Sequence, residues 1–299
     1  MSSSAPTDAP PAPAAQAEEP PPQDDWSNGL AALRAELDRI DDDLHGLLMR
    51  RARVVEQVAK SGKPSAYRPG REASILRRLL RQHSGALPPQ TLVRIWREML
   101  AGTTAMQAPF VIAVGEPGGS SLAQVAREHF GALTPLRAFS RPAQALGEVR
   151  RGSAAVAVLP LPSDTDTWWT ALLQQDTPRL CIAGRLPFWA PRAEGAPAAQ
   201  AVVVAAGAPD PSGGDRSFIG LELDPASSRA KLTGALTTAG LPPKSMILLR
   251  EPGSLVARAL VEVGGFVADD DPRLDRLHGA LHRPMVLGAY AIPEDGAAT

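Results

Sequence analysis

The chain has 299 residues, a length that predicts about two domains with hydrophobic cores. Its 31 basic and 32 acidic residues give a net charge of −1, without the basic excess that favours nucleic acid or an anionic membrane surface. The single cysteine, Cys181, excludes an internal disulfide framework and a multi-cysteine metal site, and its apolar neighbours predict a small core residue.

Residues 1–25 have the composition of a disordered tail. They contain seven prolines, five acidic residues and no Lys, Arg or His, so they cannot bury enough apolar surface to offset chain entropy. The segment lacks the positive and apolar regions of a secretory signal and the arginines of a transit peptide. No stretch of the chain approaches the ~20 apolar residues that span a bilayer. We therefore expect a soluble, cytoplasmic protein with no membrane or nucleic-acid partner.

Residues 26–61 predict one long helix. Apolar residues recur at alternating spacings of three and four, the pattern of a helix packed along its whole length. The series consists of Leu30, Leu33, Leu37, Ile40, Leu44, Leu47, Val54 and Val58. Its missing position is occupied by Arg51. Such a helix is roughly 54 Å long, so two short helices of one chain cannot cover it, and we predict that a second copy does.

Two shorter helices are expected before residue 108. The first follows Pro69 and Gly70, and Glu72 extends its apolar stripe with a carboxylate. That stripe consists of Ile75, Leu76, Leu79 and Leu80. The second begins at residues 88–89, a pair of prolines. Its stripe consists of Leu92, Ile95, Trp96, Met99 and Leu100, continued by the polar residues Thr103 and Gln107.

All three predicted helices thus carry polar groups on apolar faces. A buried, unpaired arginine costs several kcal/mol, so Arg51 must meet a carboxylate, a phosphate or water. One interpretation is a buried Arg51–Glu72 ion pair that fixes helix register, with Thr103 and Gln107 at a fraying end. The other is an anion site between helices, where helical bundles usually build ligand pockets. The occurrence of such groups on all three helices favours the anion site.

At this point the segment resembles the AroQ-type chorismate mutases. The stretches that carry the resemblance are LRAELDRIDDDLHGLLMRRARVVEQVAK, YRPGREASILRRL and VRIWREMLAGTTAMQ. They combine a mid-helix arginine, an Arg-Glu pair at the start of the second helix, and a hydroxyl residue four before a glutamine in the third. The resemblance covers about eighty residues and implies an all-α, three-helix domain in an intertwined homodimer.

The resemblance also implies the site. Arg51, together with Arg34 of the second copy, would bind the two carboxylates of chorismate. Arg71 would orient the substrate near its hydroxyl, and Glu72 would accept the hydrogen bond of that hydroxyl. Gln107 would reach the ether oxygen of the substrate, and Thr103 would lie near one of its carboxylates.

The family also has a lysine near the end of the first helix, which would donate to a carboxylate and to the ether oxygen. Counting from Arg51, that place falls at Gly62, with Lys63 and Lys60 nearby. Lys63 is about 120° from Arg51 around a helix and Lys60 about 180°, so we assign the role to Lys63. An acidic residue often present before the Arg-Glu pair is absent here.

The chemistry implied is the rearrangement of chorismate to prephenate in phenylalanine and tyrosine biosynthesis. It is unimolecular and needs no nucleophile, proton shuttle, metal or cofactor. Arginines that grip both carboxylates hold the compact conformer. A lysine and a glutamine amide stabilise the negative charge that develops on the ether oxygen.

The region from residue 109 resembles, in reduced form, the dehydratase half of bifunctional chorismate mutase/prephenate dehydratases. Three strand-containing stretches carry the likeness: VGEPGGSSLAQVAREHFG, AVAVLPLPSDTDTWWTALL and RLCIAGRLPF. DRSFIGLEL stands where that family has its catalytic threonine, and neither Asp215 nor Ser217 matches it cleanly. There is room for about one of the family's two lobes. We expect dehydratase activity to be absent, and we interpret the scattered histidines, His129 among them, as surface or satisfied residues.

The last region predicts the order β-α-β-β-α-β, a ferredoxin-like antiparallel sheet with two helices on one face. Its six segments begin at Phe218, Ser227, Lys244, Val256, Arg273 and Met285. With LREP and VLGAY the region resembles an ACT domain, which implies an aromatic amino-acid effector. A generic scaffold without a ligand is the alternative.

The predicted organisation is a tail, a helical chorismate mutase domain, a dehydratase-like α/β region and an ACT-like domain. Their bounds are 1–25, 26–108, 109–214 and 215–299. The leading functional hypothesis is an isomerase, chorismate mutase. The alternatives are a bifunctional mutase–dehydratase and a non-catalytic regulator of aromatic amino-acid biosynthesis that dimerises through the helices.

Overall fold

The computed structural model describes residues 23–61, 67–116, 118, 121–174, 176–277 and 282–296. The chain divides into two units, residues 1–54 and 55–299. Most of the predicted N-terminal tail, and the predicted site residue Lys63, lie outside the described residues. Within the described part, no helix is both long and apolar enough to cross a membrane.

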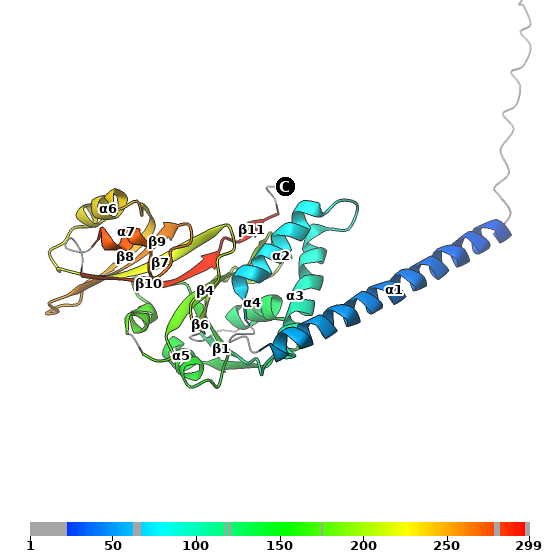
Figure 1. Ribbon diagram of the computed structural model, residues 1–299, viewed down its shortest axis with the longest axis horizontal. Helices are drawn as coiled ribbons and strands as arrows, with labels where there is room; N and C mark the ends of the chain where they lie inside the picture. The colour runs from blue at the N-terminus through cyan, green and yellow to red at the C-terminus, as the bar shows by residue number, and fades with distance from the viewer. Residues whose placement is uncertain are drawn as a thin grey trace, which may run out of the picture. The chain divides into compact units, whose positions relative to one another are not determined.

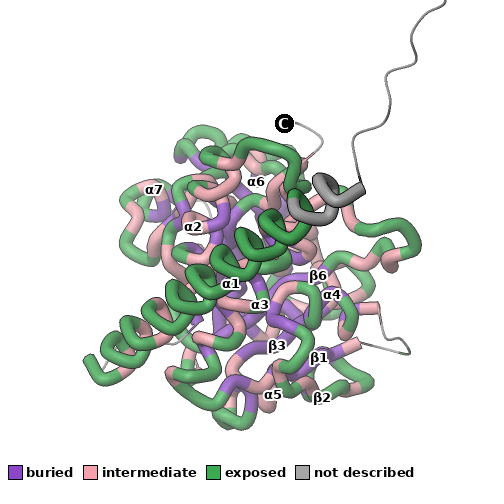
Figure 2. The backbone as a smooth tube through the Cα atoms, turned by 90° about the vertical axis from the view of Figure 1, so that its right-hand side faces the viewer, coloured by how far each residue is buried: buried purple, intermediate pink, exposed green. Residues whose placement is uncertain are grey.

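The predicted long helix is confirmed as α1 (Gln23–Lys60), a single helix of 38 residues. It begins three residues before the predicted start and ends one residue before the predicted end. Its apolar series is exposed, as the green tube in Figure 2 shows: Leu33 is 64% exposed and Leu47 60%. A continuous exposed leucine face of this length is typical of a surface that another protein covers.

The two shorter helices are also confirmed, as α2 (Pro69–Gln82) and α3 (Pro89–Ala105), each with a proline in its first turn. In α2, Ala73 and Leu76 are buried and pack with Trp96 of α3. The face of α3 that is buried differs from the predicted stripe, since Ile95 is 50% exposed. The buried residues of α3 are Val93, Arg97, Leu100 and Thr104. The reason is that α3 packs against α4 as well as α2, and this second contact uses a second face.

The segment from residue 109 to residue 206 forms five strands of a larger sheet, in the order β2-β1-β3-β6-β4. These strands are β1 (Ile112–Gly115), β2 (Leu136–Phe139), β3 (Val156–Pro160), β4 (Leu180–Leu186) and β6 (Ala201–Ala206). The first three run parallel, while β6 runs antiparallel to β3 and β4. Between them lie α4 (Ser121–Phe130), α5 (Pro142–Arg150), the short helix η1 (Trp168–Leu173) and the short strand β5 (Trp189–Ala190), which pairs with β11 (Glu294–Asp295).

Two apolar clusters cover the two faces of this half of the sheet. One contains Val125 and Phe130 of α4, and the other contains Leu146 and Val149 of α5 together with Trp169. The strands are therefore buried on both sides, which explains their near-continuous Val and Ala runs. Cys181 is a free, buried residue of β4, as predicted.

The C-terminal part has the predicted β-α-β-β-α-β order. Its elements are β7 (Asp215–Leu223), α6 (Arg229–Thr238), β8 (Pro243–Leu249), β9 (Ala257–Gly264), α7 (Pro272–Asp275) and β10 (His282–Ala291). The strands lie in the order β10-β7-β9-β8, with every neighbouring pair antiparallel. Figure 1 shows α6 and α7 on the same side of these strands, and Leu232, Leu236 and Leu274 of the two helices belong to one buried apolar cluster with residues of the strands. This is the ferredoxin-like arrangement that the sequence predicted.

The two halves form one nine-stranded sheet. They meet where β4 and β10 pair in parallel, at Ile182 and Gly288. At Gly288 the backbone has φ of +135°, and a Cβ there would lie 2.0 Å from the Ile182 carbonyl oxygen. Only glycine allows this close approach. The strands on either side of the predicted boundary at residues 214–215 therefore share one sheet.

Candidate functional site

The polar group at the start of α2 is held by α3. Glu72 Oε2 lies 3.0 Å from Nη1 of Arg97, and these side chains are 14% and 5% exposed. Burial lowers the pKa of Arg97, and the charge of Glu72 opposes that change. Removing one partner of such a pair leaves an uncompensated charge in a low-dielectric environment. The Glu72 carboxylate therefore has a fixed orientation.

His129 of α4 completes this buried polar group. Nη1 of Arg97 lies 3.4 Å from Nε2 of His129. Because a guanidinium only donates, Nε2 must accept, and the imidazole must be neutral with its proton on Nδ1. Burial, followed by the charge of Arg97, lowers the pKa of His129 well below its ordinary value of 6.5. This histidine is thus satisfied, one of the two states predicted for it, and its side chain is half-buried.

The predicted residues of α2 and α3 fall at helix ends. Arg71 is exposed in the first turn of α2, next to Glu72. Thr103 and Gln107 are half-buried and lie together, since Nε2 of Gln107 donates to the Thr103 carbonyl at 3.2 Å. The Thr103 hydroxyl donates to the carbonyl of Met99 at 2.9 Å. Gln107 lies two residues beyond the last residue of α3, in a turn.

The predicted residues of α1 lie in the first unit of the chain. Arg34 is exposed and Arg51 half-buried, seventeen positions apart on the same helix. Of the two candidate lysines, Lys60 is the last residue of α1, and its Nζ pairs with Glu56 Oε1 at 3.0 Å on the exposed surface.

The positions that would have to serve a dehydratase support the backbone instead. Both carboxylate oxygens of the buried Asp215 accept from the Ser212 amide, at 2.9 and 3.2 Å. The fully buried Ser217 hydroxyl donates to the Gly265 carbonyl at 2.9 Å and accepts from the Val267 amide at 2.8 Å. These groups hold loops in place, which is a structural use of their hydrogen-bonding capacity.

A second polar cluster, around Glu262 of β9, lies on the side of the sheet opposite to Asp215 and Ser217 of β7. Glu262 is 5% exposed and accepts from the Tyr290 hydroxyl, and its carboxylate lies 3.5 Å from both Arg185 and Arg216. Burial raises the pKa of Tyr290, and the neighbouring Glu262 raises it further. The cluster joins four strands, β4, β7, β9 and β10, and the sequence analysis did not identify it.

The helical segment matches a known family of proteins. Residues 33–108 match the family model described as chorismate mutase type II. This segment is a chorismate mutase domain. It spans most of α1 and all of α2 and α3, and a mixed α/β region follows it.

The relatives of this chain include bifunctional chorismate mutase/prephenate dehydratases. The protein of Pseudomonas aeruginosa is 30% identical over 148 residues, 46% of this chain and 40% of the relative. The protein of Neisseria gonorrhoeae is 30% identical over 138 residues, 46% and 38% of the two chains. The chain therefore matches less than half the length of these curated relatives.

Solved structures with a similar trace include the prephenate dehydratase of Streptococcus mutans. Its TM-score is 0.46 at 15% identity, covering 62% of this chain and 98% of that one. The structure titled "GqqA- a novel type of quorum quenching acylases" has a TM-score of 0.44 at 18% identity, covering 61% and 95%. The fold of residues 109–296 is defined by the strand order of its nine-stranded sheet.

Arg97 of α3 is a buried charged residue that the sequence did not reveal. Val93, Arg97, Leu100 and Thr104 follow spacings of four, three and four. This spacing is a second helical stripe with an arginine in it. Arg97 could have been found by reading α3 as a helix buried on two faces. His129 offers no such signal, because its contact with Arg97 joins residues 32 positions apart.

Proposed function

We propose that this protein is a chorismate mutase that works as a dimer, with the site built from α1, α2 and α3. The observation that carries the proposal is the match of residues 33–108 to chorismate mutase type II. The exposed apolar face of α1 supports the dimer, because a second copy offers the complementary helix. The same arrangement would bring Arg34 of one copy near Arg51 of the other.

In this proposal, catalysis is electrostatic preorganisation of the substrate. Arg51 and Arg34 of the second copy bind the two carboxylates of chorismate, with Thr103 beside one of them. Arg71 and Glu72 hold the hydroxyl end. The ion pair with Arg97 supports this role, since it fixes the Glu72 carboxylate before the substrate arrives. Gln107 donates to the ether oxygen as the C–O bond breaks, where negative charge develops.

The catalytic lysine of the family has no direct counterpart in this chain, because Gly62 occupies its position. We propose that Lys63 supplies this charge, with Lys60 as the alternative. The pairing of Lys60 with Glu56 on the exposed surface favours Lys63.

The test is a chorismate-disappearance assay on the full chain and on the variant Arg51→Ala. We expect a loss of several orders of magnitude in kcat/KM, because the arginine both binds and orients a dianion. Arg53→Ala is the matched control, since Arg53 is an exposed arginine two residues away on the same helix. Equal rates for wild type and Arg51→Ala would show that the proposed site is wrong.

A non-catalytic regulator of aromatic amino-acid biosynthesis is the second candidate, and Gly62 is the observation that favours it. That function predicts no chorismate turnover in the wild type, whereas the mutase predicts turnover that falls in Lys63→Ala. The working dehydratase is a third candidate. It predicts formation of phenylpyruvate from prephenate at neutral pH, and the structural use of Asp215 and Ser217 argues against it.

The C-terminal region is proposed to be an ACT-like domain that takes an aromatic amino acid as effector. Its ferredoxin-like strand order supports the domain assignment. We further propose that the protein acts in the cytoplasm, where the precursors of phenylalanine and tyrosine are made.

A further inference from the structure

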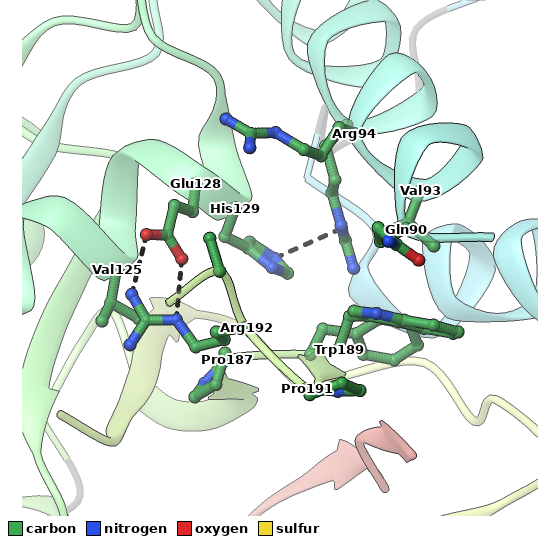
Figure 3. A pocket seen from close by; sticks show the side chains of 13 residues that line it. Gln90, Val93, Arg94, Val125, Glu128, His129, Pro187, Trp189, Pro191 and Arg192 are labelled. Atoms are coloured by element: carbon green, nitrogen blue, oxygen red, sulfur yellow. Dashed lines mark hydrogen bonds and ion pairs between the residues drawn. The ribbon is translucent and has the colours of Figure 1, made fainter. Parts of the chain in front are cut away.

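A cavity of about 270 Å³ opens between α3, α4 and the loop that follows β4. Its lining includes Val93, Arg94 and Arg97 of α3, His129 of α4, Trp189 of β5 and Arg192 of the loop. Figure 3 shows Arg94 on one side of the space, Trp189 and Pro191 on the opposite side, and Glu128 with Arg192 at a third edge. The volume lies just below the range of small-molecule pockets and suits a compound with one ring.

The cavity is separate from the proposed mutase site. Arg94 and Thr103 are nine positions apart in α3, so they lie about 180° from one another around the helix. Arg71, Glu72, Thr103 and Gln107 do not line the cavity, although Glu72 pairs with Arg97, which does. Ligand binding in this cavity therefore does not depend on the mutase proposal.

Of the three arginines that line the cavity, two are paired with carboxylates and Arg94 is not, among the described residues. Arg192 pairs with Glu128 at 2.7 Å, and Arg97 pairs with Glu72 at 3.0 Å. His129 is neutral because its Nε2 accepts from Arg97. Arg94 is exposed and has no carboxylate partner among the residues that the structure describes. A ligand with a single negative charge would balance the lining.

The walls of the cavity are apolar and partly aromatic. Phe188 and Trp189 form one side, and the Arg97 guanidinium carbon lies 4.8 Å from the centroid of the Phe188 ring, which holds that ring in place. Val93 and Val125 contribute on the helix side. The buried Nε1 of Trp189 has no acceptor in the described part of the chain. This nitrogen is not exposed to the cavity, so the indole contributes apolar surface to the wall rather than a donor.

We propose that this cavity binds a small aromatic monocarboxylate. The carboxylate pairs with Arg94 at the rim, and the ring lies between Trp189 and the valines of α3 and α4. One uncompensated arginine selects a single negative charge, while the aromatic and aliphatic walls select a planar ring. The class follows from the surplus charge, the apolar walls and the volume together.

The test uses phenylacetate as the probe, titrated into the full chain by isothermal calorimetry. Phenylacetamide keeps the ring without the charge, and acetate keeps the charge without the ring. We expect phenylacetate to bind one site per chain with a Kd at least about tenfold lower than that of either analogue. Failure of phenylacetate to bind, or equal affinity for phenylacetamide, would overturn the proposal.

Two variants locate the site. Arg94→Gln should raise the Kd for phenylacetate at least about tenfold, because the ionic hydrogen bond is lost. Arg81→Gln removes an exposed arginine of α2 outside the cavity and should leave the Kd unchanged. Equal effects of the two variants would mean non-specific attraction to positive charge, which contradicts the proposal.

A spectroscopic reading separates binding from a general loss of fold. The chain has five tryptophans, so 5-fluorotryptophan labelling gives resonances that the variant Trp189→Phe assigns. Phenylacetate should shift the Trp189 resonance and leave the resonance of Trp168, which lies in another apolar cluster. A shift at Trp168 without one at Trp189 would place the ligand elsewhere.

Discussion

Two arginines show what the sequence reveals at the scale of single residues. Arg51 interrupts a leucine series, so its unusual position can be seen without a structure. Arg97 lies outside the more hydrophobic stripe of α3. Its burial follows from the packing of α4 against a second face of this helix, which the sequence does not show. One of the two interpretations of the sequence paired Glu72 with Arg51, and the structure shows an ion pair between Glu72 and Arg97. Local spacing places the carboxylate on the apolar stripe of α2, but its pairing with Arg97 of α3 depends on tertiary packing.

The neutral His129 makes stability depend on pH. Its folded pKa is well below 6.5, so below pH 6.5 the unfolded state binds a proton that the folded state excludes. Stability is therefore full above pH 6.5 and falls as the pH drops toward the folded pKa, by up to about 1.4 kcal/mol per pH unit. The charged groups around the ring are Arg94, Arg97 and Arg192, with Glu72 and Glu128.

Urea unfolding of the wild type and of His129→Gln at pH 7.5 and pH 5.5 tests this expectation. Glutamine can accept from Arg97 but does not titrate, so the variant should lose about 1 kcal/mol less between the two pH values than the wild type. His83→Gln is the control, since His83 lies at the end of α2 outside this cluster. A pH dependence unchanged by His129→Gln would show that His129 is protonated equally in both states.

At the scale of elements, sequence patterns predicted the helices well because their ends carry strong local signals. Prolines mark the starts of α2 and α3, and the apolar series fixes the extent of α1. The C-terminal strands were also found from their apolar runs and from the turns between them. What spacing could not give is the face each helix buries, because that depends on neighbours distant in sequence. The α1 face remains exposed in the single chain, which is the reason for the proposed dimer.

Charges placed in the α1 series should separate the dimer. In the double variant Leu37→Glu and Leu44→Glu, two carboxylates would enter the proposed interface, and each unpaired charge there costs several kcal/mol. We expect a monomer by analytical ultracentrifugation and loss of chorismate turnover. The matched control is Ala32→Glu with Ala35→Glu, two positions of α1 outside the apolar series that gain the same charge. A double variant that stays dimeric and active would exclude α1 as the interface.

At the scale of the molecule, the sequence predicted two α/β regions but not that they share one sheet. Each half follows from local order: strands alternating with helices in one, and β-α-β-β-α-β in the other. The junction between β4 and β10 joins residues 106 positions apart through Ile182 and Gly288. No periodicity marks such a contact, and a glycine in a strand is the only local trace of it. One continuous sheet implies that the two halves unfold together.

Gly288→Ala tests that implication. The new Cβ would lie 2.0 Å from the carbonyl oxygen of Ile182 and 2.5 Å from its nitrogen, both backbone atoms that cannot move aside. Together with the strained φ, this overlap should cost about 3 kcal/mol of unfolding free energy. Gly207→Ala isolates the cost of a positive φ, because Gly207 has φ of +89° and open space around it, so about 1 kcal/mol is expected.

Hydrogen exchange should show β1–β3 and β7–β9 losing protection to the same extent in Gly288→Ala. Protection lost in one half alone would mean that the halves are independent, and an effect no larger than that of Gly207→Ala would mean that the strands separate at the junction without cost.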